Sequence, residues 1–536
     1  MSQENISSSN PSSNFFFSAN QNSQNNQENQ IDSKFQNRQE KFIAEEDFSK
    51  IKESVMSKDL SLSENNRNKI FLQKRLQKQI NMESNVSLMN SLSMSKDAYD
   101  QLNSEEIQPS DFKKIVSLFL SQNIDDKFKG LMGIRKLLSI EPSPPIQEII
   151  DLKLVPEIIR FLENCPNEFK YEALWSLSNI AYGNEDQANT ILINGGLPKI
   201  INLLDSNIEE IKTQSIWLIG NLVSISSKIR DIIIEYKIFD KILTILASTN
   251  SGQYITTSTW CISNFFKTKP ILNYEITYKA FKVIAKIALI YGSKDKNNYE
   301  FITDLCFIFS FMTKNYKEFI NEIIDTNLLP TIISFLDINN KGILLTCLRI
   351  IGNVVLGNAN QTQKIIDLNA LDKLKYTLYN ENSRIRTESA FIISNIAAGT
   401  QKQIETLIDQ NFLQILSKLF RSDTSPQVKN EAIFGIANLT SVENELYMKK
   451  LVDDGILIII FECMKTDVAK YIAISLEALA NILSFGKKKG ELKYFVNEIE
   501  KMGMFDILEK LQTHENDIIY QKTLQILENY FDTENC

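Results

Sequence analysis

Asparagine recurs along this 536-residue chain at a nearly fixed interval. The steps are 42, 43, 89, 42, 43 and 43 residues, for Asn179, Asn221, Asn264, Asn353, Asn395, Asn438 and Asn481. The long step spans two periods, with Phe311 where an asparagine is expected. A period of about 40–47 residues is typical of two- or three-helix repeats that stack into a solenoid. The sequence therefore predicts an all-α solenoid of about ten units from about residue 111 to the end of the chain.

An aromatic residue stands four positions before most of these sites: Trp175, Trp217, Trp260, Phe307, Phe391 and Phe434. Helix positions i, i+3 and i+7 share one face, so Glu172, Trp175 and Asn179 are expected to point the same way. The next repeat has Gln214, Trp217 and Asn221 at the same spacing, so they are also expected to share one helix face. The apolar residues between them, such as Leu174 and Leu177, are expected to face the core.

This repeated face suits an extended peptide. An asparagine amide offers a donor and an acceptor, which match the C=O and N–H of a backbone. Tryptophan rings between successive asparagines are expected to form slots for the stems of Lys or Arg, with a cation–π contribution of about 0.5–2 kcal/mol. The alternative is structural, since a lone asparagine commonly caps or crosslinks a turn. Seven asparagines in phase favour a ligand surface, because seven buried polar groups would be costly where leucine would serve.

Composition excludes several other classes of function. The net charge of −8 and a pI near 5.2 argue against a general nucleic-acid binder. The longest apolar runs fall short of the ~20 residues that a membrane span needs. The six cysteines lack CxxC spacing, so we expect no zinc site or disulfide framework and a reducing compartment. With His514 as the only histidine, the sequence predicts no catalytic residues, no metal and no cofactor.

The chain before the repeats is polar. Residues 1–30 contain 21 Ser, Asn or Gln, and residues 1–37 are predicted to be disordered. Residues 38–85 form a candidate basic recognition segment, for which a solvated polar helix or coil is the alternative. Its bases are Arg67, Lys69, Lys74, Arg75 and Lys78. Residues 86–107 are read as a linker and residues 108–536 as the solenoid.

Turn signals divide the repeats into helices. The cluster Pro142-Ser-Pro-Pro145 must interrupt a helix, because proline lacks the amide donor. The phrase Ile193-Asn-Gly-Gly-Leu-Pro198 indicates a helix end, a turn and a helix start, with proline in the first helical turn. Related phrases follow at Ile324 to Pro330 and Leu451 to Ile456.

Several segments resemble the importin-α family of armadillo-repeat proteins. They are Ile134-Arg-Lys-Leu-Leu-Ser-Ile-Glu-Pro-Ser-Pro-Pro-Ile146, Ala173-Leu-Trp-Ser-Leu-Ser-Asn-Ile-Ala181 and Leu348-Arg-Ile-Ile-Gly-Asn-Val-Val355. The resemblance covers roughly residues 108–500. It implies a right-handed superhelix of three-helix repeats, no catalytic activity, and the role of a nuclear-import adaptor that shuttles between cytoplasm and nucleus.

The resemblance also implies two grooves for nuclear-localisation signals. The major groove would be lined by Trp175, Asn179, Gly183, Gln214, Trp217, Asn221, Trp260, Asn264, Glu300 and Asp304. The minor groove would be lined by Asn353, Glu388, Phe391, Asn395, Glu431, Phe434 and Asn438. In both lists the carboxylates would pair with basic side chains of the signal.

The chain departs from the family pattern at several of these positions. Ile225 replaces an aspartate and Ala188 a threonine of the pocket that takes a lysine, and Phe391 and Phe434 stand where the family has tryptophan. A charged hydrogen bond lost from such a pocket costs about 1.5–3 kcal/mol. We therefore expect a divergent member with an altered preference for signals.

By resemblance, the basic segment would bind importin-β and the C-terminal repeat, Phe505 to Phe531, would bind a nuclear export receptor. The segment lacks the family's run of consecutive arginines. These departures leave one alternative open, an armadillo scaffold for cytoskeletal, ciliary or junctional proteins.

Overall fold

The computed structural model describes residues 88, 90–292, 294 and 296–531. These residues form two compact units, one ending at Ile350 and one beginning at Ile351, and each is considered by itself. Every regular element among them is an α-helix or a short 3-10 helix. The polar tail and the candidate basic segment, Arg67 to Lys78 included, lie outside the described residues.

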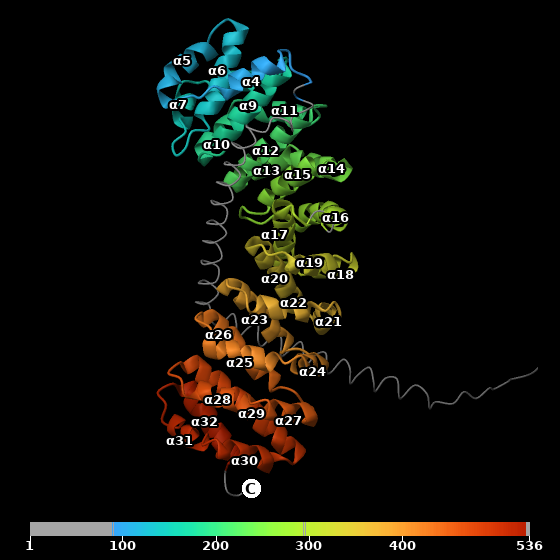
Figure 1. Ribbon diagram of the computed structural model, residues 1–536, viewed down its shortest axis with the longest axis vertical. Coiled ribbons are helices and arrows are strands. Elements are labelled where there is room, and N and C mark those ends of the chain that lie inside the picture. The colour runs from blue at the N-terminus through green and yellow to red at the C-terminus, as the bar shows by residue number, and fades with distance from the viewer. Residues whose placement is uncertain (1–87, 89, 293, 295, 532–536) are drawn as a thin grey trace, which may run out of the picture. The chain divides into compact units, whose positions relative to one another are not determined.

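The helices form ten repeats, and each repeat ends on a long helix that we call its third helix (Figure 1). In the first unit of the chain these are α6 (Ile124–Leu137), α9 (Asn167–Ile180), α12 (Glu209–Ile225), α15 (Gly252–Phe265) and α17 (Tyr299–Asn315). Helix α20 (Lys341–Val355) contains the boundary between the units. The later third helices are α23 (Ser383–Ile396), α26 (Pro426–Leu439), α29 (Ala469–Lys489) and α32 (Asp517–Tyr530). The predicted all-α armadillo architecture of about ten repeats is confirmed.

Two shorter helices precede the third helix in most repeats. In the first unit of the chain they are α7 (Ile146–Asp151), α8 (Val155–Arg160), α10 (Glu185–Ile193), α11 (Gly196–Leu203), α13 (Ser227–Glu235), α14 (Ile238–Ser248), α18 (Glu318–Asp325) and α19 (Leu329–Ser334), which continues as η3 (Phe335–Asp337). In the second they are α21 (Ala359–Asp367), α22 (Ala370–Thr377), α24 (Gln401–Asp409), α25 (Phe412–Ser422), α27 (Glu445–Asp453), α28 (Ile456–Met464), α30 (Leu492–Lys501) and α31 (Phe505–Leu511). The proline cluster at 142–145 and the three predicted turns all fall between helices.

A residue with left-handed backbone makes the turn between the first two helices. Examples are Gly195 at φ 73° and Asn369 at φ 56°, and asparagine and glycine tolerate this conformation best. The fifth repeat is different, because one continuous helix, α16 (Tyr274–Tyr291), replaces the pair. A left-handed residue at the C-terminal end of a helix normally terminates it, and α16 runs through the position where the other repeats place one.

The core follows the predicted helical spacing. Leu174, Leu177 and Ile180 of α9 are fully buried, as expected for the residues between the asparagine face positions. Within the described residues no single helix is both long and apolar enough to span a membrane, although the bent pair Glu318–Asp325 and Leu329–Asp337 meets that test by length and composition.

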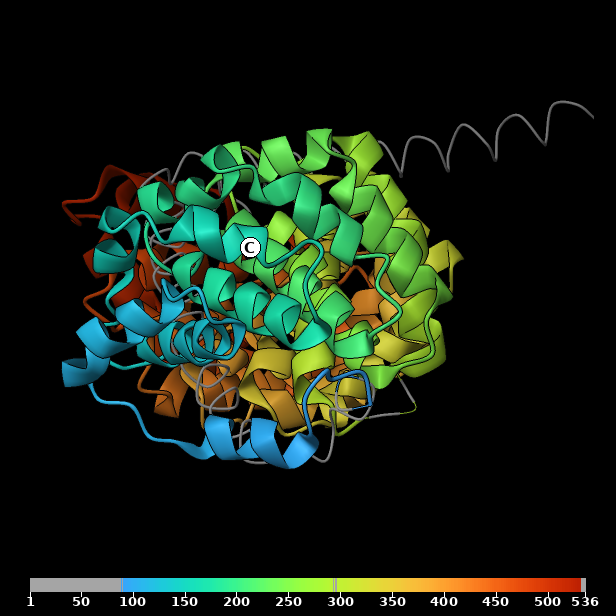
Figure 2. The ribbon, with the colours of Figure 1, turned by 90° about the horizontal axis from the view of Figure 1, so that it is seen from above.

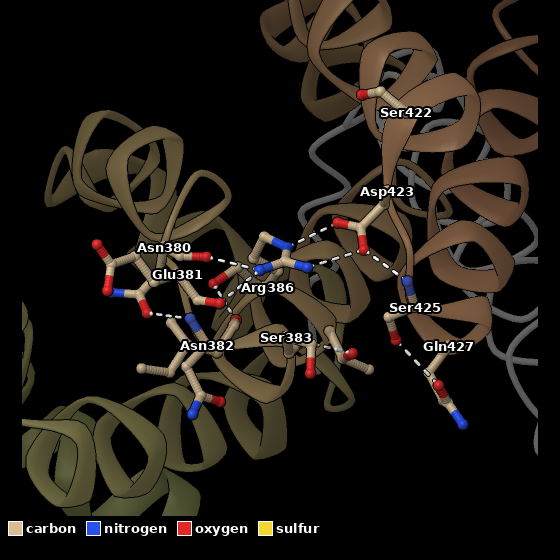
Figure 3. A network of polar contacts seen from close by, with 12 residues as sticks. Asn380, Glu381, Asn382, Ser383, Arg386, Ser422, Asp423, Ser425 and Gln427 are labelled. Atoms are coloured by element: carbon tan, nitrogen blue, oxygen red, sulfur yellow. Dashed lines mark hydrogen bonds and ion pairs between the residues drawn. The ribbon is translucent and has the colours of Figure 1, made fainter.

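Polar side chains also join neighbouring repeats, as the network in Figure 3 shows. Arg386 of α23 binds both oxygens of Asp423, with Nε–Oδ2 at 2.6 Å and Nη2–Oδ1 at 2.8 Å. Its Nη1 also donates to the backbone carbonyls of Asn380 and Glu381. Because Asp423 ends α25, this bidentate pair connects the turns of two successive repeats.

The chain ahead of the first repeat is partly helical. Helix α4 (Lys96–Ser104) lies in the stretch expected to be a linker, and η2 (Pro109–Asp111) leads from it into α5 (Phe112–Phe119). Seen from above, α4 is a blue helix joined to α5 by an irregular connection (Figure 2). The asparagine period carries no information on this segment, because it lies outside the repeats.

Candidate functional site

The residues predicted for the major groove lie on successive third helices of the first unit, and we call them the first set. Helices α6, α9, α12, α15 and α17 pack one against the next. The first set forms rungs: Glu172, Trp175 and Asn179 on α9, Gln214, Trp217 and Asn221 on α12, Trp260 and Asn264 on α15, and Glu300 and Asp304 on α17. These side chains thus occupy corresponding positions of successive third helices. Gly183 follows α9 in the turn to α10.

The asparagines of the second and third rungs connect each repeat to the one before it. Asn221 Nδ2 donates to the carbonyl of Ser178 at 2.9 Å, and Asn264 Nδ2 donates to the carbonyl of Gly220 at 3.0 Å. At the end of α9 the amide of Tyr182 bonds to the carbonyl of Asn179, so the Ser178 carbonyl takes its donor from the next repeat. The structural role of these asparagines is therefore real.

That role uses one N–H of each amide group. Asn221 and Asn264 are only 6% and 1% exposed, so each is held rigidly. An asparagine amide has a second N–H and a carbonyl oxygen with which it can meet a ligand. In Asn264 this oxygen already accepts from Lys267 Nζ at 2.5 Å. Crosslinking through one N–H is thus compatible with ligand binding at Asn221, whereas Lys267 must first release the Asn264 oxygen.

Asn179 of the first rung differs from the other two. Its Nδ2 donates to Ser139 Oγ at 2.9 Å and lies 3.4 Å from the carbonyl of Arg135. Both partners belong to the first repeat, which lacks an asparagine of its own in the series. The hydrogen bonds between repeats therefore extend to the first repeat, although that repeat has no asparagine of the series.

The tryptophan slots expected between rungs are filled in this structure. The rings of Trp217 and Trp260 stack directly, with centroids 4.3 Å apart and planes at 17°. A side chain held between two rings needs about twice the 3.5–4.0 Å carbon contact distance. Gly220 permits this stacking, because a Cβ there would lie 2.2 Å from Trp260 Cζ3. A basic side chain must therefore use an outer face of the pair or separate the rings.

The face of Trp175 is covered by Arg135 of α6. The guanidinium carbon lies 4.5 Å from the ring centroid, and Nε bonds to Glu172 Oε2 at 2.7 Å. Both side chains of this ion pair are fully buried. Sequence reasoning missed Arg135 as a member of the site. The sequence feature that could have indicated Arg135 is its position in the preceding repeat, 37 residues before Glu172.

The two α17 carboxylates of the first set, Glu300 and Asp304, are partly or fully buried. Asp304 is fully buried, and its Oδ1 accepts from Ser263 Oγ of α15 at 3.0 Å. Glu300 is half-buried on the same helix, one turn earlier. Gln214 Nε2 donates to Ser178 Oγ at 3.1 Å, so it too spans two repeats. Ile225 is the half-buried last residue of α12, and Ala188 is fully buried in α10.

The residues predicted for the minor groove, the second set, lie in the second unit on α20, α23 and α26. Asn438 Nδ2 donates to the carbonyl of Ser394 at 2.7 Å, the same crosslink as in the first set. Asn395 instead donates to Phe391 in its own helix, at 2.7 Å. Glu431 is 7% exposed and accepts from Ser394 Oγ at 3.4 Å. The second set comprises Asn353, Glu388, Phe391, Asn395, Glu431, Phe434 and Asn438.

Lysines lie over two further aromatic rings of the series. Lys470 Nζ lies 5.0 Å from the ring centroid of Phe434, and Lys267 Nζ lies 5.8 Å from that of Phe307. Both distances are within the range of a cation–π contact. The rings of both sets thus attract cations, and the chain supplies several of these cations itself. His514 is half-exposed between α31 and α32, where its Nδ1 accepts from the amide of Asn516.

Comparison with known proteins places this geometry in a family. The armadillo/beta-catenin-like repeat family matches residues 184–224, and the atypical Arm repeat family matches residues 494–535. The chain is 31% identical over 423 residues to importin subunit alpha-3 of Arabidopsis thaliana, across 77% of this chain and 78% of the relative. It is 31% identical over 451 residues to importin subunit alpha-1a of Oryza sativa subsp. japonica, across 75% and 76% of the two chains. The crystal structure of an engineered protein shares the fold, with a TM-score of 0.64 at 21% identity over 78% of this chain and 99% of that one.

Proposed function

Because the chain belongs to the importin-α family of non-enzymatic nuclear-import adaptors, we propose that it binds Lys/Arg-rich nuclear-localisation signals and links their cargo to importin-β. The first set is the proposed major site for the signal, and the second set is a separate, weaker site. The adaptor would accordingly shuttle between cytoplasm and nucleus. Residues 38–85 are the proposed importin-β segment, and the C-terminal repeat is the proposed contact of an export receptor.

The observation that carries this proposal is the row of rigid asparagines on packed third helices. Packed helices lie about 8–10 Å apart, and an extended peptide advances about 3.3 Å per residue. One rung would therefore meet about every third residue of an extended peptide. An asparagine amide can bond to the peptide backbone whatever the sequence, as an adaptor for many cargoes requires, although Lys267 must first leave the Asn264 oxygen.

Acidic residues supply the preference for basic side chains. Glu300 and Asp304 follow the third rung on α17, and the whole chain carries a net charge of −8. A carboxylate beside an aromatic face binds a Lys or Arg through charge and through contact with the stem. Because Glu300 is half-buried rather than enclosed, binding of a basic side chain to it should weaken as salt increases.

The test is direct binding by the full-length chain. We expect a Lys-rich monopartite peptide to bind with micromolar or tighter affinity, more weakly at 0.5 M than at about 0.1 M salt, in fluorescence anisotropy. All three tryptophans of the chain belong to the first set, so their intrinsic fluorescence reports on the same site. The double substitution Asn221→Ala/Asn264→Ala is expected to abolish most of this binding.

A matched control separates binding from stability. Asn481 of α29 donates to Thr440 Oγ1 at 3.0 Å, so Asn481→Ala also removes a crosslink between repeats but lies in neither set. It should leave peptide affinity unchanged. If Asn221→Ala/Asn264→Ala binds as tightly as this control, the first set is not the signal site.

The stacked Trp217–Trp260 pair and Ile225 favour one second candidate, an armadillo scaffold for cytoskeletal, ciliary or junctional proteins. A closed slot and a pocket without its carboxylate suit a partner that is not rich in lysine. The full-length chain would then bind neither a monopartite nor a bipartite basic peptide. It would also keep its partners after deletion of residues 1–85, whereas an adaptor would lose importin-β.

A further inference from the structure

The segment ahead of the first repeat is bonded to the first rung. We call residues 90–105 the strap, and α4 forms most of it. The Tyr99 hydroxyl donates to Glu172 Oε1 at 2.6 Å, and Asn103 Oδ1 accepts from Arg135 Nη2 at 2.7 Å. The amide and hydroxyl of Ser93 both donate to the Glu168 carboxylate, with the amide 3.2 Å from Oε1. The partners of the strap in these hydrogen bonds belong to α6 and α9.

The strap is packed as well as hydrogen-bonded. Tyr99 is only 2% exposed, and its ring centroid lies 6.2 Å from that of Phe128 in α6. Lys136 Nζ donates to the carbonyls of Leu102 and Glu105, at 2.8 and 2.6 Å, near the end of α4 where helical carbonyls lack partners. Beneath this cover, Glu168 and Glu172 are fully buried.

The first rung is therefore occupied by the chain itself. Both oxygens of Glu172 accept a hydrogen bond, one from Tyr99 and one from Arg135. Arg135 also lies over the Trp175 ring. A basic side chain that approached this rung would exchange one charged bond for another and would meet the Arg135 guanidinium, a like charge. Such an exchange yields little affinity.

We propose that the strap closes the first rung to the ligand, so that an extended basic peptide is recognised from the second rung onward. This inference rests on the proposed function of the first set. Tyr99 and Asn103 then act as specificity-determining residues, because they limit how many basic side chains of a signal contribute to affinity. Release of the strap would return Glu168 and Glu172 to the surface and lengthen the site by one rung.

The experiment compares peptides of two lengths on the full-length chain. The probes are a Lys-rich core peptide and the same peptide with two further lysines at its N-terminal or C-terminal end. The proteins are the wild type, Tyr99→Ala/Asn103→Ala, and the control Lys96→Gln at an exposed position of α4. Hydrogen exchange of residues 96–104 reports whether the strap is in place.

In the wild type and in Lys96→Gln, we expect both extensions to change the dissociation constant by less than about twofold. In Tyr99→Ala/Asn103→Ala, faster exchange at α4 should accompany unchanged core binding and about fivefold tighter binding of one extended peptide, a typical effect of one exposed charge pair. The inference is overturned if the wild type gains as much from extension as the double variant. It is equally overturned if α4 is released and neither extension gains. If the core peptide binds to none of the three proteins, the proposed function itself fails.

Discussion

The first and second sets are built on the same repeat, yet they hold their asparagines differently. In the first set Asn221 and Asn264 both bond to the preceding repeat, and the rings are tryptophan. In the second set Asn438 makes this bond, whereas Asn395 bonds to its own helix and the rings are phenylalanine. A crosslinked amide has one orientation imposed by two repeats. The first set is therefore the better-organised of the two proposed ligand surfaces, although more of its aromatic area is already covered.

The two sets also differ in the ion pairs beside them, and this gives the largest expected effect. Arg135–Glu172 is fully buried, whereas the side chains of Arg386 and Asp423 are 15% and 3% exposed. Arg135→Met leaves a buried carboxylate without its cation and should lower the free energy of unfolding by about 3–5 kcal/mol. Arg386→Met should cost about 1.5–3 kcal/mol, the value of a charged hydrogen bond. Urea denaturation measures both.

The control is the triple substitution Arg135→Met/Glu172→Leu/Tyr99→Phe, which replaces the whole pair by apolar groups and also removes the buried Tyr99 hydroxyl that donates to Glu172. Such replacements are often neutral, so most of the lost stability should return. Equal losses for Arg135→Met and Arg386→Met would show that burial does not separate the two pairs.

Affinity for a monopartite basic peptide gives the next largest difference. Asn221→Ala/Asn264→Ala should weaken it about 30- to 150-fold, because each substitution removes a hydrogen bond of about 1–1.5 kcal/mol. Asn395→Ala/Asn438→Ala should weaken it less than about threefold, since the weaker second site would contribute little. Anisotropy titrations at one salt concentration make the comparison. A larger loss from the second pair would reverse the proposed order of the two sites.

A smaller gain is expected from restoring tryptophan to the second set. Tryptophan is the strongest cation–π partner, and exposed contacts contribute about 0.5–1 kcal/mol. Phe391→Trp should therefore tighten binding of a bipartite peptide by about two- to fivefold and leave a monopartite peptide unaffected, whereas Phe434→Trp should add little because Lys470 already lies over that ring. The reciprocal variant, Trp175→Phe, should change little, because Arg135 already covers that ring. A tighter monopartite complex would mean that the second set binds short signals as well.

The sequence predicted the repeat, the helical face and the turns because each depends on local spacing. Leu174 and Leu177 fall in the predicted core, whereas Asn179, Asn221 and Asn264, predicted for a ligand face, are only 5%, 6% and 1% exposed. What the sequence could not show is which groups satisfy one another across repeats. The Asn221–Ser178 bond joins residues 43 positions apart, and Tyr99 meets Glu172 across 73.

Ring packing was equally invisible in the sequence. The spacing predicts that Trp217 and Trp260 are neighbours on adjacent helices. Whether a slot remains between them depends on their rotamers and on Gly220, whose missing side chain lets the rings meet. The strap was overlooked for a related reason, because its short helix has no repeat partner and its polar residues bond only in three dimensions.

The last effect we predict is a stability that rises with pH in both units, but in separate pH windows. Burial first, and then the Arg135 charge, lower the pKa of Lys136 to about 8. The folded state therefore binds fewer protons than the unfolded state between about pH 8 and the ordinary lysine value near 10.4, and stability should rise with pH there. In the second unit, burial opposes but hydrogen bonds from Arg386 and the Ser425 amide outweigh it, and the pKa of Asp423 is lowered. Stability from Asp423 is thus complete above about pH 4 and is lost as the pH falls below that value.

Thermal unfolding of the wild type against two variants separates these contributions. Lys136→Met should lose the rise between pH 8 and 9.5, and Arg386→Gln should lose part of the fall between pH 4.5 and 3, windows set by the two pKa shifts. Because Lys136 binds the carbonyls at the end of α4, its effect should appear first as protection of the strap from limited proteolysis. A wild-type strap that becomes easier to cleave from pH 8 to 9.5, relative to Lys136→Met, would contradict the assigned environment of this lysine.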